Sequence, residues 1–133
     1  MVDSAGTVGA AESWGFAGDT VAVSADAVAE AVRARIADGK LESLLESSAG
    51  RTLFVVSNTE RAMVMLLDHP GDPGEHATDP GAEEWSDGFV LSNGQADAYP
   101  DADTVPLGEA LRIVRHILAV GRPPADAAWA VDR

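Results

Sequence analysis

The sequence predicts an α+β fold: a mostly antiparallel sheet built from two hairpins, with helices packed on one face. Two pairs of β-prone runs, each joined by a short turn, predict the hairpins. Segments with apolar residues at helical spacing precede and follow them. The length of 133 residues fits one domain, which we expect over residues 20–133, after a flexible N-terminal segment of residues 1–19.

The part of the chain before the hairpins is expected to form a strand and two helices. Residues 20–23 (TVAV) are a short β-prone run. A helix is predicted over residues 25–38, because Ser24 is a favourable N-cap and β-branched apolar residues follow at every fourth position. Residues 41–46, with three leucines and two glutamates, indicate a second short helical piece that ends by Gly50.

The two hairpins are the strongest local signals. The first pairs residues 52–57 with residues 61–67 across a three-residue turn. The second begins at residues 88–92, turns at Asn93-Gly94 and returns over residues 95–99. Because Asn-Gly accepts positive φ at both positions, we predict a type I′ turn there.

The last helix and a closing strand complete the expected order. Pro106 suits the first turn of a helix, and a leucine-rich face follows it until Gly121 and a proline pair end the helix. Residues 127–131 are expected to return as a strand, with Trp129 in the core.

The net charge of −13 is concentrated in one part of the chain. The fifty residues between Arg61 and Arg112 contain eleven acids and no lysine or arginine. Nucleic acid and anionic membranes are therefore poor partners, since both require cationic groups. A basic protein partner is favoured, because complementary potentials accelerate association. The same charge also fits a feature that only keeps the protein soluble.

The candidate binding residues lie in the stretch from residue 69 to residue 87, which is expected to be a long irregular loop. A tryptophan among acids there fits an interface, where Trp is enriched, and fits equally an aromatic that folds back over the sheet. The candidates are the acids of this stretch and its tryptophan: Asp72, Glu75, Asp79, Glu83, Glu84, Trp85 and Asp87.

The residues that an enzyme needs occur only as fragments. The chain has no cysteine, which excludes thiol nucleophiles and cysteine-bound metals. His69 and His76 lie among carboxylates, but their spacing matches neither a helical ligand pair nor a calcium loop. His116 is expected to cap the last helix or to be partly buried. Without a nucleophile or phosphate-binding motif, we expect no catalytic residue, no metal and no cofactor.

Targeting segments are not evident in the sequence. No apolar run reaches the roughly 18 residues that span a bilayer, and residues 1–19 have no basic or apolar region of a signal peptide. The expected compartment is the cytoplasm.

The second half of the chain carries an ordered set of segments that is similar to a known family. The segments are RAMVMLLD, GEHATDPGAEEWSDG, FVLSNGQADAYPDADTVPLGEAL and RIVRHILAVGRPP, followed by Trp129. Over about residues 51–131 they resemble family one of the immunity proteins from bacterial polymorphic toxin systems. The resemblance implies an α+β fold, no catalytic residues, and binding to a toxin, often one of the deaminase superfamily.

Charge and resemblance together predict a cytoplasmic immunity protein. It would neutralise a cognate toxin, a basic and nucleic-acid-targeting deaminase, by stoichiometric binding through an acidic surface. Two alternatives remain open at this point. One is a small metal-dependent or hydrolytic enzyme that uses the segment from His69 to Asp79, and the other is an adaptor domain without a toxin partner.

Overall fold

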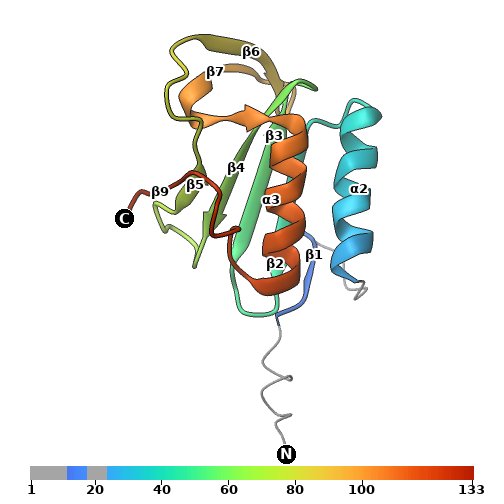
Figure 1. Ribbon diagram of the computed structural model, residues 1–133. Coiled ribbons are helices and arrows are strands. Elements are labelled where there is room, and N and C mark those ends of the chain that lie inside the picture. Colours follow the sequence, from blue (N-terminus) through green and yellow to red (C-terminus); the bar gives the residue numbers. More distant parts are fainter. Residues whose placement is uncertain (1–11, 18–23) are drawn as a thin grey trace, which may run out of the picture.

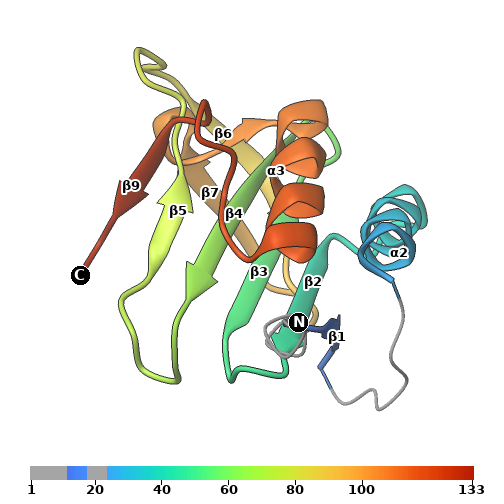
Figure 2. The ribbon, with the colours of Figure 1, turned by 60° about the horizontal axis from the view of Figure 1, so that its bottom comes forward.

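The computed structural model describes residues 12–17 and 24–133, and it shows the α+β class. Two helices, α2 (Ala25–Ala37) and α3 (Leu107–Val120), lie beside each other on one face of a mostly antiparallel sheet (Figures 1 and 2). No helix among the described residues is long and apolar enough to cross a membrane.

The main sheet has seven strands, and every pairing in it is antiparallel. The strand order is β1-β2-β3-β4-β5-β9, and β8 pairs with β4 beside β5. The strands are β1 (Trp14–Phe16), β2 (Glu42–Ser47), β3 (Thr52–Ser57), β4 (Arg61–Leu67), β5 (Glu75–Ala77), β8 (Val105–Pro106) and β9 (Trp129–Val131).

The hydrophobic core lies between this sheet and the two helices. Alternate residues of β3 and β4 point toward the helices, and α2 and α3 each bury an apolar stripe against them. Residues that are at most 1% exposed include Val32, Leu53, Val64, Ile113 and Ile117. Burying side chains of this size contributes about 1.5–3 kcal/mol each.

The helix predictions for residues 25–38 and for the last helix are confirmed. The Ser24 hydroxyl accepts a hydrogen bond from the backbone N–H of Ala27 at 3.1 Å, as an N-cap does. At the end of α3, Gly121 adopts the left-handed conformation with φ 85°, which ends the helix.

A second, two-stranded sheet packs on the other side of the main sheet (Figure 2). It is the hairpin of β6 (Trp85–Val90) and β7 (Ala96–Pro100), followed by a 3₁₀ turn over Asp101–Asp103. Phe89 is fully buried under this hairpin and meets the Tyr99 ring edge-to-face at 4.9 Å. The two rings pack on each other within the hairpin, and β6 lies against β3 of the main sheet.

The prediction of a helical piece over residues 41–46 was wrong. Residues 42–47 form β2, which pairs with β3 on one side and with β1 on the other. Ser43 and Leu45 are buried on the helix side of the sheet. Pairing with two neighbouring strands outweighs the helical propensity of leucine and glutamate.

The expectation of a flexible segment over residues 1–19 was wrong for residues 14–16. They form β1, and Trp14 is only 4% exposed within the core. The Arg51 guanidinium lies 5.9 Å from the centre of its ring. The strand expected over residues 20–23 lies outside the described residues.

The second hairpin is present, but its predicted turn type was wrong. Gly94 alone of the Asn93-Gly94 pair has a positive φ, at 89°. The backbone N–H of Gly94 donates to Leu91 O at 2.9 Å, and that of Leu91 donates to Gln95 O at 2.8 Å. These bonds enclose a three-residue loop with a left-handed glycine, the next most common hairpin connection. The Asn93 carboxamide oxygen instead accepts from the Gln95 N–H at 2.9 Å.

The stretch from residue 69 to residue 87 contains more regular structure than expected. Its centre forms β5, and β6 begins at Trp85. The three residues of β5 carry no alternating pattern of their own, and the ladder with β4 and β9 makes them a strand. The first hairpin, residues 52–57 and 61–67, and the closing strand at Trp129 are confirmed.

Replacing Gly94 with valine should destabilise the fold by more than about 1 kcal/mol, because a β-branched side chain resists positive φ. A Cβ at this position meets nothing within 4 Å, so the effect would come from the backbone alone. Ala96→Val, at an exposed strand position, is the matched control. Urea unfolding measures both variants, and equal midpoints for Gly94→Val and wild type would contradict the loop geometry.

Thr59, in the turn between β3 and β4, is the one described non-glycine residue with positive φ, at 79°. Such a conformation costs a β-branched residue on the order of 1–3 kcal/mol. We expect Thr59→Gly to raise the unfolding free energy by about 1 kcal/mol, and Thr59→Ala to raise it less. A lower melting temperature for Thr59→Gly would show that the threonine side chain stabilises this turn.

Candidate functional site

The structure divides the predicted binding residues into two groups. Asp72, Glu75 and Asp79 have arginine partners within the domain, whereas Glu83, Glu84 and Asp87 make no ion pair with any described residue. The first group neutralises charge inside the fold. Only the second group, together with Trp85, is free for a partner.

Asp72 is the most enclosed member of the first group, because its residue is 5% exposed. Arg133 contacts both of its carboxylate oxygens at 2.8 to 3.1 Å, and the Asp68 N–H donates to it at 2.8 Å. The hydrogen bonds from Arg133 and the Asp68 backbone lower the pKa of Asp72 to about 2. Glu75 binds the same guanidinium at 2.6 Å and also accepts from the Trp129 indole N–H at 2.6 Å.

Asp79 forms an ion pair with a second arginine, Arg61. The Arg61 guanidinium contacts the Asp79 carboxylate at 2.5 Å, the Thr104 hydroxyl at 2.7 Å and the Asp101 carbonyl at 3.1 Å. Arg61 therefore joins β4 to the loop before β6 and to the 3₁₀ turn after β7. This carboxylate is part of the frame that positions the second hairpin.

The remaining candidates form an exposed acidic surface around one aromatic ring. Trp85 is 67% exposed, so it does not fold back over the sheet. Beside it is a hollow of about 440 Å³, lined by Asn58, Glu60, Trp85, Ser86, Asp87 and Ala98. We call this group the Trp85 surface: Glu60, Glu83, Glu84, Trp85 and Asp87, all of them exposed.

Hydrogen bonds around the first half of β6 hold the backbone of Trp85 in place. The Asn58 side chain donates to the Asp87 carbonyl at 2.9 Å. The Ser86 hydroxyl donates to the Asp101 carboxylate at 2.6 Å, and the Asp101 N–H donates to Glu84 O at 2.8 Å. The ring is thus presented by a strand that is hydrogen-bonded on both flanks, which reduces the conformational entropy that a partner would have to restrict.

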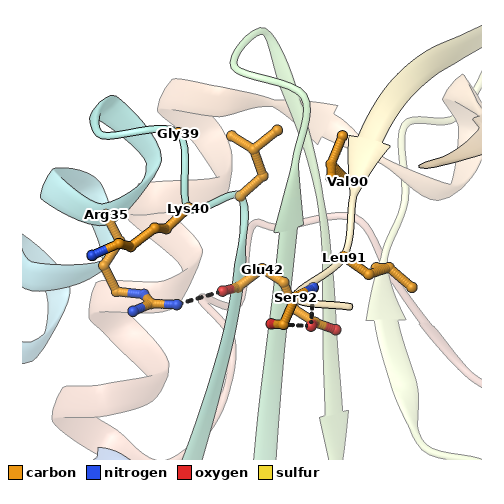
Figure 3. Close-up of a pocket in the computed structure, with 8 residues that line it drawn as sticks. Arg35, Gly39, Lys40, Glu42, Val90, Leu91 and Ser92 are labelled. Atoms are coloured by element: carbon orange, nitrogen blue, oxygen red, sulfur yellow. Dashed lines mark hydrogen bonds between the residues drawn. The ribbon is translucent and has the colours of Figure 1, made fainter. Parts of the chain in front are cut away.

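The far end of the hairpin is fixed at a second hollow, of about 260 Å³, between α2, β2 and the hairpin tip (Figure 3). There the Ser92 N–H and hydroxyl both donate to the Glu42 carboxylate, at 2.9 and 2.5 Å. The Arg35 guanidinium points toward β2 and donates to Glu42 O at 2.8 Å. Ser92 and Arg35 both bond Glu42, so these residues connect the hairpin tip and α2 to β2.

His76 lies at a third hollow, of about 220 Å³, whose other lining residues include Met63, Met65 and Tyr99. Its Nδ1 lies 2.8 Å from the Asp132 carboxylate and its Nε2 lies 3.1 Å from that of Asp103. Burial disfavours the charged imidazole, but hydrogen bonds and charges of the two carboxylates outweigh it and raise the pKa of His76 above 6.5. Protonated His76 bridges β5 to the segments around residues 103 and 132.

The histidines are not assembled into a metal site within residues 12–17 and 24–133. No group of three or more His, Asp or Glu side chains there has the arrangement of a metal site. The Nδ1 atom of His69 lies 3.0 Å from its neighbour Pro70 O. His116 bonds Arg122 O at 2.7 Å, beyond the end of α3, as expected of a capping residue.

The sequence analysis missed Glu60 and the two neutralising arginines. Glu60 precedes the acidic segment, and only the packing of the β3–β4 turn beside β6 places it at Trp85. Arg61 borders the acidic segment, and Arg133 lies far from that segment in the chain. A count of charges within the segment therefore gave no partner for the segment's acids. The predicted closing strand over residues 127–131 was the one signal in the sequence that could have placed Arg133 beside the sheet.

Comparisons with known proteins give no family for this chain. No family model matches it, and no match was found among curated proteins or among solved structures.

The stability of the fold should depend on the protonation of His76. Because the folded-state pKa is raised, the stabilisation is fully present below the unfolded pKa, about 6.5, and is lost as the pH rises through the folded pKa. We expect the difference in unfolding free energy between wild type and His76→Gln to shrink from pH 5 to pH 9. His69→Gln is the control for loss of an imidazole, because His69 is exposed and makes no ion pair with a described residue. A difference that stays constant over this range would show that folding does not raise the pKa of His76.

Proposed function

We propose that this protein is an immunity protein that neutralises a cognate toxin by stoichiometric binding through the Trp85 surface. The proposed partner is a basic toxin domain that acts on nucleic acid, of the deaminase superfamily that the sequence resemblance implies, and the proposed place of action is the cytoplasm. A toxin of this kind needs a cationic cleft for its polyanionic substrate. An acidic surface with the same sign as that substrate is suited to occupy or cover the cleft.

The observation that supports the proposal is the exposed ring of Trp85 among carboxylates that make no ion pair with a described residue. Trp14 is buried and Trp129 is partly buried against the core, so only Trp85 of the three tryptophans is presented to solvent. Tryptophan is enriched at binding hot spots, whereas a feature that only increases solubility needs no exposed indole.

The direct test is protection of cells from the toxin module encoded beside this protein's gene. Co-expression of the wild-type chain should restore growth, and the purified proteins should form a 1:1 complex. Loss of protection by a variant with the Trp85 surface altered and the fold intact would support the proposed site. Growth arrest that wild-type protein fails to relieve would refute the function for that pair.

Neutralising the Trp85 surface should slow association and weaken its dependence on salt. The variant Glu83→Gln/Glu84→Gln/Asp87→Asn removes three charges that have no internal ion pair. The Debye length falls from about 10 Å at 0.1 M to about 3 Å at 1 M salt, so wild-type association should slow across this range and variant association should change less. Stopped-flow binding to the toxin measures both rates.

A matched variant separates local from global charge. Glu30→Gln/Asp38→Asn/Glu46→Gln removes the same formal charge from exposed positions on α2 and β2 and after α2. It should keep a nearly wild-type association rate and salt slope. Equal slowing in both variants would mean that net charge alone steers the toxin.

A further inference from the structure

The hollow beside Trp85 has the chemistry of a receptor for one positively charged, planar group. It combines an open aromatic ring with two carboxylate residues, Glu60 and Asp87, in its lining. The face of an indole attracts cations, and a carboxylate beside it supplies the opposite charge. Elsewhere in the described chain, arginines already lie over aromatic rings, with Arg35 over Phe16 at 5.3 Å and Arg51 over Trp14 at 5.9 Å. Trp85 has no such cation among the described residues.

The carboxylates of the hollow are available to an external cation. In the described part of the chain, Glu60 and Asp87 make no ion pair, whereas most acids of the same segment are matched by Arg61, Arg112 or Arg133. The volume of about 440 Å³ is open enough for the end of a long side chain and too large for a bare metal ion alone.

The geometry of the lining favours arginine over lysine. A guanidinium is planar, stacks on an aromatic face, and directs several N–H groups outward in its plane toward acceptors. The acceptors that the hollow offers are the carboxylates of Glu60 and Asp87. An ammonium group is more strongly hydrated and would lose more on leaving water.

The hollow is also preorganised. Trp85 pairs with Pro100 across the hairpin, and the Asn58 side chain ties the β3–β4 turn to Asp87 O at 2.9 Å. Glu60 lies in that turn, and the Asn58 carboxamide oxygen accepts from the Glu60 N–H at 3.0 Å. The backbones of Trp85, Glu60 and Asp87 are therefore held in register before a partner arrives, which limits the entropy lost on binding.

We propose that the hollow beside Trp85 binds an arginine side chain of the partner protein, with the guanidinium stacked on the indole and its N–H groups donating to Glu60 and Asp87. This inference rests on the proposed function for the identity of the partner, a basic toxin domain. The recognition chemistry itself belongs to this chain and is testable without the toxin.

The first experiment uses the full-length protein and small probes. The indole N–H resonance of Trp85 is assigned with Trp85→Phe and followed by NMR during titration with N-acetyl-argininamide. The neutral isostere N-acetyl-citrullinamide and N-acetyl-lysinamide are the comparison probes. We expect a saturable shift in the millimolar range for the arginine probe, and smaller shifts for the other two. Equal shifts for arginine and citrulline probes, or no shift at all, would overturn the inference.

Variants of the hollow add a second readout in the same titration. Glu60→Gln/Asp87→Asn should lower the affinity for the arginine probe by at least about fivefold. The matched variant Asp38→Asn/Glu46→Gln should leave this affinity unchanged. Because these positions are exposed, both variants should keep the wild-type melting temperature. Unaltered probe affinity in Glu60→Gln/Asp87→Asn would overturn the role of the carboxylates.

The second experiment measures the cognate toxin against a series at Trp85. An arginine stacked on the ring predicts that Trp85→Phe keeps part of the affinity and that Trp85→Leu loses about tenfold or more, mainly through faster dissociation. If Trp85→Leu binds and protects as well as wild type, the arginine inference fails while the immunity function stands. If wild-type protein neither binds the toxin nor protects cells, the proposed function fails, and the probe titration still decides the chemistry of the hollow.

Discussion

Two arginines bind five carboxylates that would otherwise repel one another. Arg61 contacts Asp79 and Asp101, and Arg133 contacts Asp68, Asp72 and Glu75. Each arginine joins segments far apart in the chain, so the acidic residues become connections between β4, β5, β9 and the loops around them. The position of the second hairpin, and with it the Trp85 surface, depends on the contacts of Arg61 with Asp79 and with the turn after β7.

This arrangement explains why a protein with nine basic and 22 acidic residues keeps some carboxylates exposed at one place. Cations are scarce, and two of them, Arg61 and Arg133, lie where carboxylates approach the core or meet at strand junctions. Asp72, held at a pKa of about 2, is the clearest case. Glu83, Glu84 and Asp87 lie on a loop and an edge strand, where water solvates them at no structural cost. An exposed tryptophan among them has no comparable structural explanation.

The fold class can be predicted from the sequence because the strongest structural signals in it are local. Ser24, the first hairpin and Gly121 mark their elements through capping, turns and periodicity that need no distant partner. Residues 41–46 and Trp14 were misjudged because their conformation comes from pairing with strands elsewhere. The same limit applied to the site. Trp85 and its neighbouring acids were found by composition, but the partners of Asp72 and Asp79 and the approach of Glu60 depend on tertiary contacts.

The hairpin that carries Trp85 also shows how the molecule separates stability from binding. Its inner side buries Phe89 against Tyr99 and bonds Ser86 to Asp101, while its outer side leaves Trp85 exposed. Successive side chains of a strand point to opposite faces, and the irregularity between Ser86 and Phe89 brings Phe89 to the face of Ser86, opposite Trp85. One strand therefore holds the hairpin to the domain and presents the indole to solvent. Substitutions on the outer side can therefore change the partner without disturbing the contacts that hold the hairpin. A binding surface of this kind can diversify on a constant framework, which is what a protein matched to one particular basic partner requires.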